Sequence, residues 1–88
     1  MKIDMSIYQE EKNYTEKQGQ YLAFIFYYTK INGIPPAQID LQRYFGVTPP
    51  TIHQMILQLE KKGLISRISN TPRSLKLCIP EEQLPRLK

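Results

Sequence analysis

The stretch from residue 46 to 63, GVTPPTIHQMILQLEKKG, constrains the chain most, because it combines a start, an apolar stripe and an end for one helix. Thr48 is a suitable N-cap, and Pro49 fits the first helical position, where a missing N–H costs nothing. A glycine after two lysines is typical of a helix end. We therefore predict a helix over residues 49–62. Its apolar stripe is formed at i, i+4 and i+7 by Ile52, Ile56 and Leu59.

The remaining surface of this helix is polar and cationic. It carries Thr51, His53, Gln54, Gln58, Lys61 and Lys62, with Met55 at the edge of the stripe. A helix with an apolar back and a donor-rich front is typical of a helix that reads a DNA groove. The same pattern also occurs on ordinary surface helices, so the neighbouring elements decide between the two.

A second short helix precedes this one and is predicted to open at Pro36-Ala37. Its inner face carries Ala37, Leu41 and Phe45 at i, i+4 and i+8, and Gly46 ends it. Only three residues, 46–48, then lead into the following helix. Two short helices joined by a tight turn that contains glycine indicate a helix-turn-helix.

Past Gly63 the apolar period changes from helical to alternating. Ser66–Ile68 and Leu75–Ile79 are predicted strands, and the turn-forming residues 69–73 lie between them. A hairpin directly after a helix-turn-helix is a wing. The predicted fold class is therefore α+β, a winged helix-turn-helix with three helices and a two- or three-stranded β wing, in which Ile34–Pro35 is the candidate third strand.

The first of the three helices begins at a capping box, Thr15-Glu16-Lys17-Gln18, and is predicted to end at Asn32 before Gly33. It has more large apolar side chains than one buried face can hold. Either the chain covers this helix on two sides, or part of it meets a second subunit. We favour a homodimer, whose candidate interface residues are Phe24, Tyr27, Tyr28 and Ile31. Ligand binding by these side chains is less favoured, because no polar groups converge on them.

Charge and chain order divide the sequence unevenly. Residues 1–14 are predicted to be a flexible or weakly helical arm, 15–79 the winged helix-turn-helix domain, and 80–88 a poorly ordered tail from which Leu84 and Leu87 can dock. Residues 1–45 hold five basic and five acidic residues, whereas residues 46–88 hold seven basic and three acidic. The whole excess of +4 therefore lies in the half with the polar helix, which favours a polyanionic partner.

Several classes of function are not expected. The chain shows no arrangement of residues typical of an enzyme, and we expect no cofactor. A single cysteine, Cys78, excludes an internal disulfide and, beside a single histidine, argues against a metal site. The longest apolar run, YLAFIFYY, is too short to cross a membrane, and no export signal is visible. We expect a cytoplasmic protein with no membrane partner and no evident small-molecule effector.

With these elements in place, the chain resembles the N-terminal winged-helix DNA-binding domain of the LexA repressors. The shared runs are TEKQ, NGIPPAQIDLQRYFGV, TPPTIHQMILQLEKKGLISR and PRSLKL, which together cover about residues 15–79. The most specific segments are Gly33–Pro36, Lys61–Ile65 and Arg73–Leu77. The broader MarR-like winged-helix group is a looser match.

The resemblance implies a double-stranded DNA partner and base reading early in the helix over residues 49–62. The positions concerned hold Pro50, Thr51, His53, Gln54 and Met55, whereas the family usually has Asn and acidic residues there. We therefore expect a different operator. LexA repressors also carry a C-terminal Ser–Lys peptidase domain that cleaves the chain and provides most of the dimer contact. We expect neither that cleavage nor that contact from these residues, which leaves another interface or a monomer.

The candidate contacts follow from side-chain chemistry. For bases they are Thr51, His53, Gln54 and Met55, since an amide fits an adenine edge and a threonine methyl fits a thymine methyl. For the DNA backbone they are Thr48, Gln58, Arg67, Arg73 and Lys76, and Arg73 is also a candidate for the minor groove. The simpler alternative is that these are solvated polar residues, and that Thr48 only caps its helix.

We predict that the protein is a transcriptional regulator of the repressor type, which binds double-stranded DNA in a sequence-specific manner. The main alternative is a winged-helix protein-interaction module that docks through the aromatic face of helix 16–32. A third alternative is a nucleic-acid binder without sequence preference.

Overall fold

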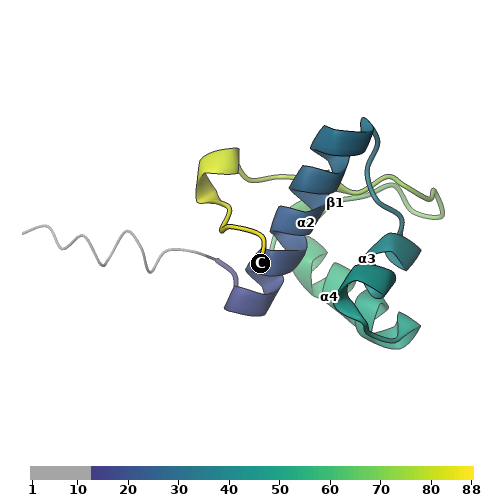
Figure 1. Cartoon of the computed structure of the whole chain (residues 1–88). Helices are drawn as coiled ribbons and strands as arrows, with labels where there is room; N and C mark the ends of the chain where they lie inside the picture. Colours follow the sequence, from purple (N-terminus) through teal and green to yellow (C-terminus); the bar gives the residue numbers. More distant parts are fainter. Residues whose placement is uncertain (1–12) are drawn as a thin grey trace, which may run out of the picture.

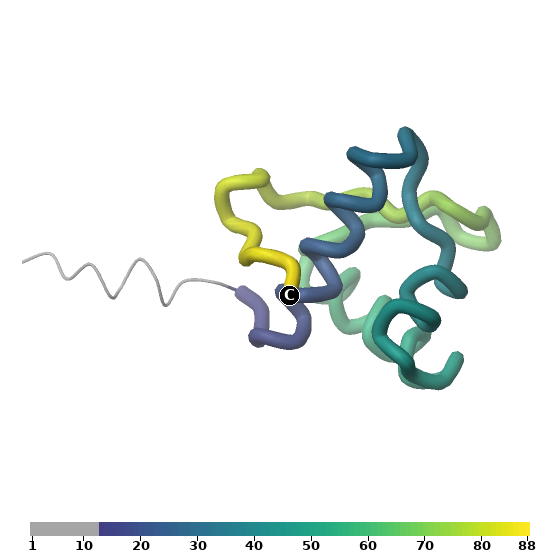
Figure 2. Tube along the Cα trace, in the orientation of Figure 1, coloured from purple at the N-terminus to yellow at the C-terminus, as the bar shows by residue number. Residues whose placement is uncertain are grey.

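The computed structural model describes residues 13–88, so most of the predicted N-terminal arm, residues 1–12, lies outside it. In this part of the chain three helices are followed by a hairpin (Figures 1 and 2). The elements are α2 (Glu16–Asn32), α3 (Gln38–Phe45), α4 (Pro49–Lys61), β1 (Ile65–Ser66), β2 (Lys76–Leu77) and the short 3-10 helix η1 (Glu81–Gln83). The predicted α+β winged helix-turn-helix is confirmed.

The predicted capping box begins α2. The Thr15 hydroxyl accepts a hydrogen bond from the Gln18 N–H at 3.1 Å, and Gln18 Oε1 accepts one from the Thr15 N–H at 3.0 Å. The helix ends where Gly33 enters the left-handed region, with φ +77°, and donates its N–H to the Thr29 carbonyl oxygen at 2.8 Å. Both predicted ends are therefore confirmed, because each depends on residues within one turn of it.

The helix-turn-helix is formed by α3 and α4. Asp40 Oδ2 accepts the Ala37 N–H at 2.8 Å and so satisfies a free donor at the start of α3. Gly46 ends α3 with φ +66°, a conformation that a side chain would strain. The chain then enters α4 within the predicted three residues, and Lys62 and Gly63 follow its last turn.

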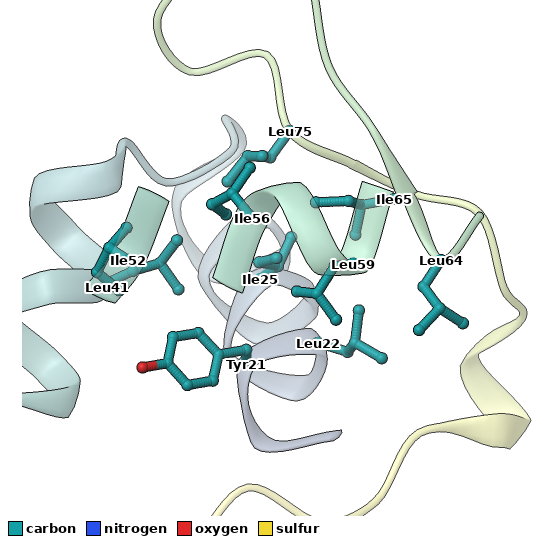
Figure 3. Close-up of a cluster of buried hydrophobic side chains, with 10 residues drawn as sticks. All are labelled: Tyr21, Leu22, Ile25, Leu41, Ile52, Ile56, Leu59, Leu64, Ile65 and Leu75. Carbon is teal, nitrogen blue, oxygen red and sulfur yellow. The ribbon is translucent and has the colours of Figure 1, made fainter. Parts of the chain in front are cut away.

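The core lies between α2, α4 and the hairpin, with one side chain from α3 (Figure 3). The predicted stripe of α4 is fully buried there, at 1% exposure or less for each of its three residues. The whole cluster is Tyr21, Leu22, Ile25, Leu41, Ile52, Ile56, Leu59, Leu64, Ile65 and Leu75. Burial of one face of α4 against this cluster determines which residues its other face presents to solvent.

The wing is shorter than predicted. The antiparallel strands pair only Ile65 with Leu77 and Ser66 with Lys76. Pairing stops there because the Ser74 hydroxyl accepts the Ile68 N–H at 2.9 Å, which closes a loop in place of further ladder bonds. Within residues 13–88 the sheet has two strands, so the candidate third strand at Ile34–Pro35 does not form. Two successive prolines, 35 and 36, remove the N–H donors that such a strand would need.

The C-terminal segment, expected to be poorly ordered, instead packs along α2, opposite the hairpin loop in Figure 1. The Tyr14 hydroxyl donates to the Gln83 carbonyl oxygen. Gln20 Nε2 donates to the Arg86 carbonyl oxygen at 2.8 Å, and Leu84 packs against the core. Sequence reasoning missed this order because the polar partners are more than 60 positions away.

The large apolar side chains of α2 are divided between its own chain and solvent. The Phe24 ring lies 4.6 Å from the Tyr44 ring and 5.7 Å from the Phe45 ring, so α3 covers it. Tyr27 and Ile31, in contrast, are 38% and 79% exposed. Coverage of α2 on two sides by its own chain therefore explains part of the surplus, and these two residues remain for an interface.

Candidate nucleic-acid interface

The outer face of α4 presents most of the predicted base-reading residues. Thr51, His53 and Gln54 are exposed, whereas Met55 is half-buried and packs against the core. Successive helical residues are rotated by about 100°, so Met55 and His53 lie about 160° apart around the axis. Gln54 lies between them on the side away from the buried stripe, so the one amide of the group is presented to solvent.

The N-terminus of α4 differs from the prediction. Thr48 occupies the N-cap position, but its hydroxyl lies 3.0 Å from the Thr51 hydroxyl and accepts no main-chain N–H. Pro49 and Pro50 then remove the first two donors of the helix. A helix N-terminus binds anions through such N–H groups, so this one is a poorer phosphate site than an ordinary helix start.

Gln58 is tied to α2 through a buried amide. Gln18, which is only 6% exposed, donates from Nε2 to Gln58 Oε1 at 3.3 Å. Its own Oε1 accepts from Lys62 Nζ at 2.8 Å. The two bonds join the start of α2 to the second half of α4 and to the residue that follows it. Gln58 and Lys62 therefore help to hold α4 in place, a role that sequence reasoning missed because Gln18 had been assigned only to the capping box.

The three predicted wing cations lie in different environments. Arg67 Nε is 3.2 Å from Glu60 Oε1, so this cation is paired with α4. Lys76 is exposed on β2. Arg73, in the loop between the strands, contacts three acceptors outside the hairpin through Nη1. They are Asp40 Oδ2 at 3.1 Å, the Tyr28 hydroxyl oxygen at 3.2 Å and the Pro35 carbonyl oxygen at 3.3 Å.

We refer to the side chains of Tyr28, Asp40 and Arg73 as the wing latch. The hydrogen bond from the Ala37 N–H lowers the pKa of Asp40, and the neighbouring positive charge of Arg73 lowers it further. The hydrogen bond to the Tyr28 hydroxyl, followed by the contact with Asp40, raises the pKa of Arg73. Asp40 was not among the predicted site residues, although an acid at the third position of a helix is a known capping pattern that the sequence displays.

A surface groove of about 450 Å³ lies between α2 and β2. Its apolar walls include Phe26, Leu75 and Leu77. The nearby hydroxyls of Thr29 and Ser74 already donate to main-chain carbonyl oxygens, so their protons are not free to donate to a ligand. The absence of a small-molecule effector stays a prediction.

Residues 13–88 form neither a metal site nor a membrane-spanning helix. In that range no three side chains of the His, Cys, Asp and Glu types come together as a metal site would require. None of the helices there combines the length and the apolar character needed to cross a membrane.

The three-helix arrangement, the buried stripe of α4 and the two-stranded hairpin together define a winged helix-turn-helix protein. A more particular assignment comes from sequence comparison. The model of the family described as the LexA DNA binding domain matches residues 11–74. The chain belongs to this family, which confirms the resemblance.

Individual relatives agree with the family match. The chain is 38% identical over 73 residues to the LexA repressor of Thermosipho melanesiensis, which covers 83% of this chain and 37% of the relative. It is 38% identical over 66 residues to the LexA repressor of Thermotoga maritima, covering 75% and 34%. For the LexA repressor of Leptospira interrogans the identity is 34% over 76 residues, covering 84% and 37%. The chain thus matches roughly a third of the length of these relatives.

Proposed function

We propose that this chain is a repressor that binds double-stranded DNA in a sequence-specific manner. In this proposal α4 enters the major groove, and Gln54 and Thr51 read base edges, with His53 and Met55 at the sides of the contact. Arg67, Arg73 and Lys76 hold the adjacent backbone from the wing, and Thr48 and Gln58 do so from α4. The relatives described above are LexA repressors, which supports the repressor assignment.

The observation that carries the proposal is the combination of a buried stripe and an exposed polar face on α4. The buried stripe fixes the orientation of α4 against the core. Thr51 and Gln54, on the other side of the helix, therefore project into solvent in a defined direction. The excess charge of +4 in residues 46–88 adds attraction for phosphate, whatever the base sequence.

The test is fluorescence anisotropy against duplexes selected from a random pool, with a salt titration. We expect an enriched motif and a fall of log K with log salt whose slope corresponds to about 4–6 phosphate contacts for each subunit. Gln54→Ala should weaken binding to the motif by about 1–3 kcal/mol and relax the preference at one base pair. Gln83→Ala, the same change in the C-terminal segment, is the matched control. Binding weaker than about 10⁻⁴ M at physiological salt, with no motif, would refute the proposal.

We propose further that the protein acts as a homodimer through the exposed part of α2. Of the four predicted residues, Phe24 and Tyr28 have partners within the chain, which leaves Tyr27 and Ile31 as the main contacts. A dimer predicts an inverted repeat with half-sites one helical turn, about 10–10.5 bp, or a multiple of it apart. Ile31→Glu should give a monomer in sedimentation velocity, whereas Ile68→Glu, at an exposed position on the wing, should not. A wild-type monomer at high micromolar concentration would contradict this.

The alternative of a protein-interaction module rests on the same exposed pair, Tyr27 and Ile31. It predicts that Gln54→Ala leaves binding to the protein partner unchanged, whereas Ile31→Glu abolishes that binding. A binder without sequence preference would instead bind random and selected duplexes equally. The cytoplasmic location and the absence of catalysis both stay predictions.

A further inference from the structure

Arg73 has an unusual backbone conformation for its position in the wing. Its φ of 56° lies in the left-handed region, which residues other than glycine adopt at a cost of roughly 1–2 kcal/mol. Such a conformation persists only where surrounding contacts hold it. The contacts that hold Arg73 are therefore strong enough to offset this cost.

Those contacts join the wing to three separate segments. Arg73 Nη1 donates to Tyr28 on α2, to the Pro35 carbonyl in the connection between α2 and α3, and to Asp40 on α3. One Nη nitrogen has two N–H groups, so the three acceptors share them. No other guanidinium nitrogen of Arg73 has a hydrogen-bond partner in the described part of the chain, so Nε and Nη2 remain as donors for a phosphate.

The acceptor at the centre of the wing latch is itself fixed. Asp40 Oδ2 accepts the Ala37 N–H at 2.8 Å as well as Arg73 Nη1, so the start of α3 determines where the carboxylate lies. Its side chain is 18% exposed, which limits screening of the ion pair by solvent. Asp40 therefore fixes the position of Arg73 relative to α3 of the helix-turn-helix.

The rest of the wing loop has no comparable connection. Ser74 exchanges hydrogen bonds with both main-chain groups of Ile68, and the Thr71 carbonyl accepts from the Ser74 hydroxyl, so these bonds stay inside the loop. Within the described residues, Arg73 is the one member of 68–74 that is hydrogen-bonded to a helix or to the connection between α2 and α3.

From this arrangement we infer that Tyr28 and Asp40 are positioning residues for DNA binding: through Arg73 they hold the wing at a fixed angle to the recognition helix α4. Neither residue touches DNA in this scheme. They keep the unused donors of Arg73 directed outward. The wing and α4 are then already oriented to contact the same duplex before DNA binds. The inference rests on the proposed function, and it assigns Tyr28 to the wing latch in place of a dimer interface.

The test uses Asp40→Asn and Tyr28→Phe, with Glu16→Gln as the control. Asparagine keeps an acceptor for the Ala37 N–H and removes the charge, and Glu16 belongs to a different exposed ion pair, with Lys88. Without DNA, amide hydrogen exchange by NMR should speed up in residues 68–74 of both latch variants, while the core amides of α4 keep wild-type rates. The control should match wild type throughout.

With the selected duplex, each latch variant should bind about three- to tenfold more weakly, as expected if the fraction of molecules with the wing in place falls to between a third and a tenth. The salt slope should not change, because no phosphate contact is removed. Arg73→Gln should lower both the affinity and the slope, the latter by about one.

Three results would overturn the inference. Wild-type exchange in residues 68–74 of both latch variants would show that the wing latch holds nothing. Faster exchange with unchanged DNA affinity would show that the wing angle does not matter, although α4 would still bind. A lower salt slope for Asp40→Asn would show loss of a phosphate contact in place of a change in angle. Failure of the proposed function is distinct, since the wild type would then bind no duplex.

Discussion

Replacing Tyr21 with phenylalanine should stabilise the protein, although it removes a polar group. The Tyr21 side chain is fully buried, and its ring stacks on Phe45 with the centroids 4.0 Å apart. Its hydroxyl has no hydrogen-bond partner among the described residues. Burial also raises the pKa of this hydroxyl, because an ionised phenolate would lose its hydration.

The magnitude follows from the cost of an unpaired hydroxyl. A buried polar group without a partner costs about 1–3 kcal/mol relative to its hydrated state. Phenylalanine keeps the ring and its stacking and leaves almost no cavity, so most of that cost is recovered. We expect the free energy of unfolding to rise by about 1 kcal/mol. For a domain of this size the melting temperature should then rise by about 4–8 °C.

Urea unfolding followed by circular dichroism is the appropriate assay, with the m-value unchanged. Tyr44→Phe is the matched control, because the Tyr44 hydroxyl donates to the Lys88 carbonyl oxygen at 2.8 Å. That variant should lose about 0.5–1 kcal/mol. A loss of stability in Tyr21→Phe as large as in the control would refute the reasoning, since it would mean that the buried hydroxyl makes a favourable hydrogen bond.

Three other changes test the contacts described above. Gly19→Ala would place a Cβ 2.7 Å from the Tyr14 ring, so it should cost about 1–3 kcal/mol and release the C-terminal segment to protease, whereas unchanged digestion would contradict that packing. Thr48→Ala should cost less than the usual 1 kcal/mol of a lost cap in urea unfolding, because its hydroxyl meets only Thr51. Because the pKa of Asp40 is lowered, its contribution to the free energy of unfolding is present at neutral pH and is lost as pH falls through that pKa. Asp40→Asn should flatten this part of a curve of stability against pH. An unchanged curve would argue against the pairing of Asp40 with Arg73.

Most of the helical framework was predictable because its signals are local. The capping box at Thr15, the left-handed Gly33 and Gly46, and the stripe of α4 each involve residues within one or two turns. The candidate base-reading face followed from the same stripe, since burial of one side exposes the other. Met55, predicted at the edge of the stripe, is half-buried and packs against the core, so it is less available for base contact than its polar neighbours.

The wing and the tail were less predictable, for a different reason. The length of the strands depended on the Ser74 hydroxyl, which accepts the Ile68 N–H in place of a partner on the opposite strand. Strand propensities do not predict such a side-chain contact. Order in the C-terminal segment depended on Tyr14 and Gln20, which lie more than 60 residues away. Such contacts form only after the helices have assembled.

The sequence by itself thus determined the three helices, their ends and the buried stripe of α4, because these depend on hydrogen bonds and periodicity over a few residues. Only the tertiary structure decided what each cation does. From sequence, Arg73 was one basic residue of a hairpin. In the fold it meets Asp40, 33 positions away, because the turn between α3 and α4 and the path of the hairpin bring the two side chains together.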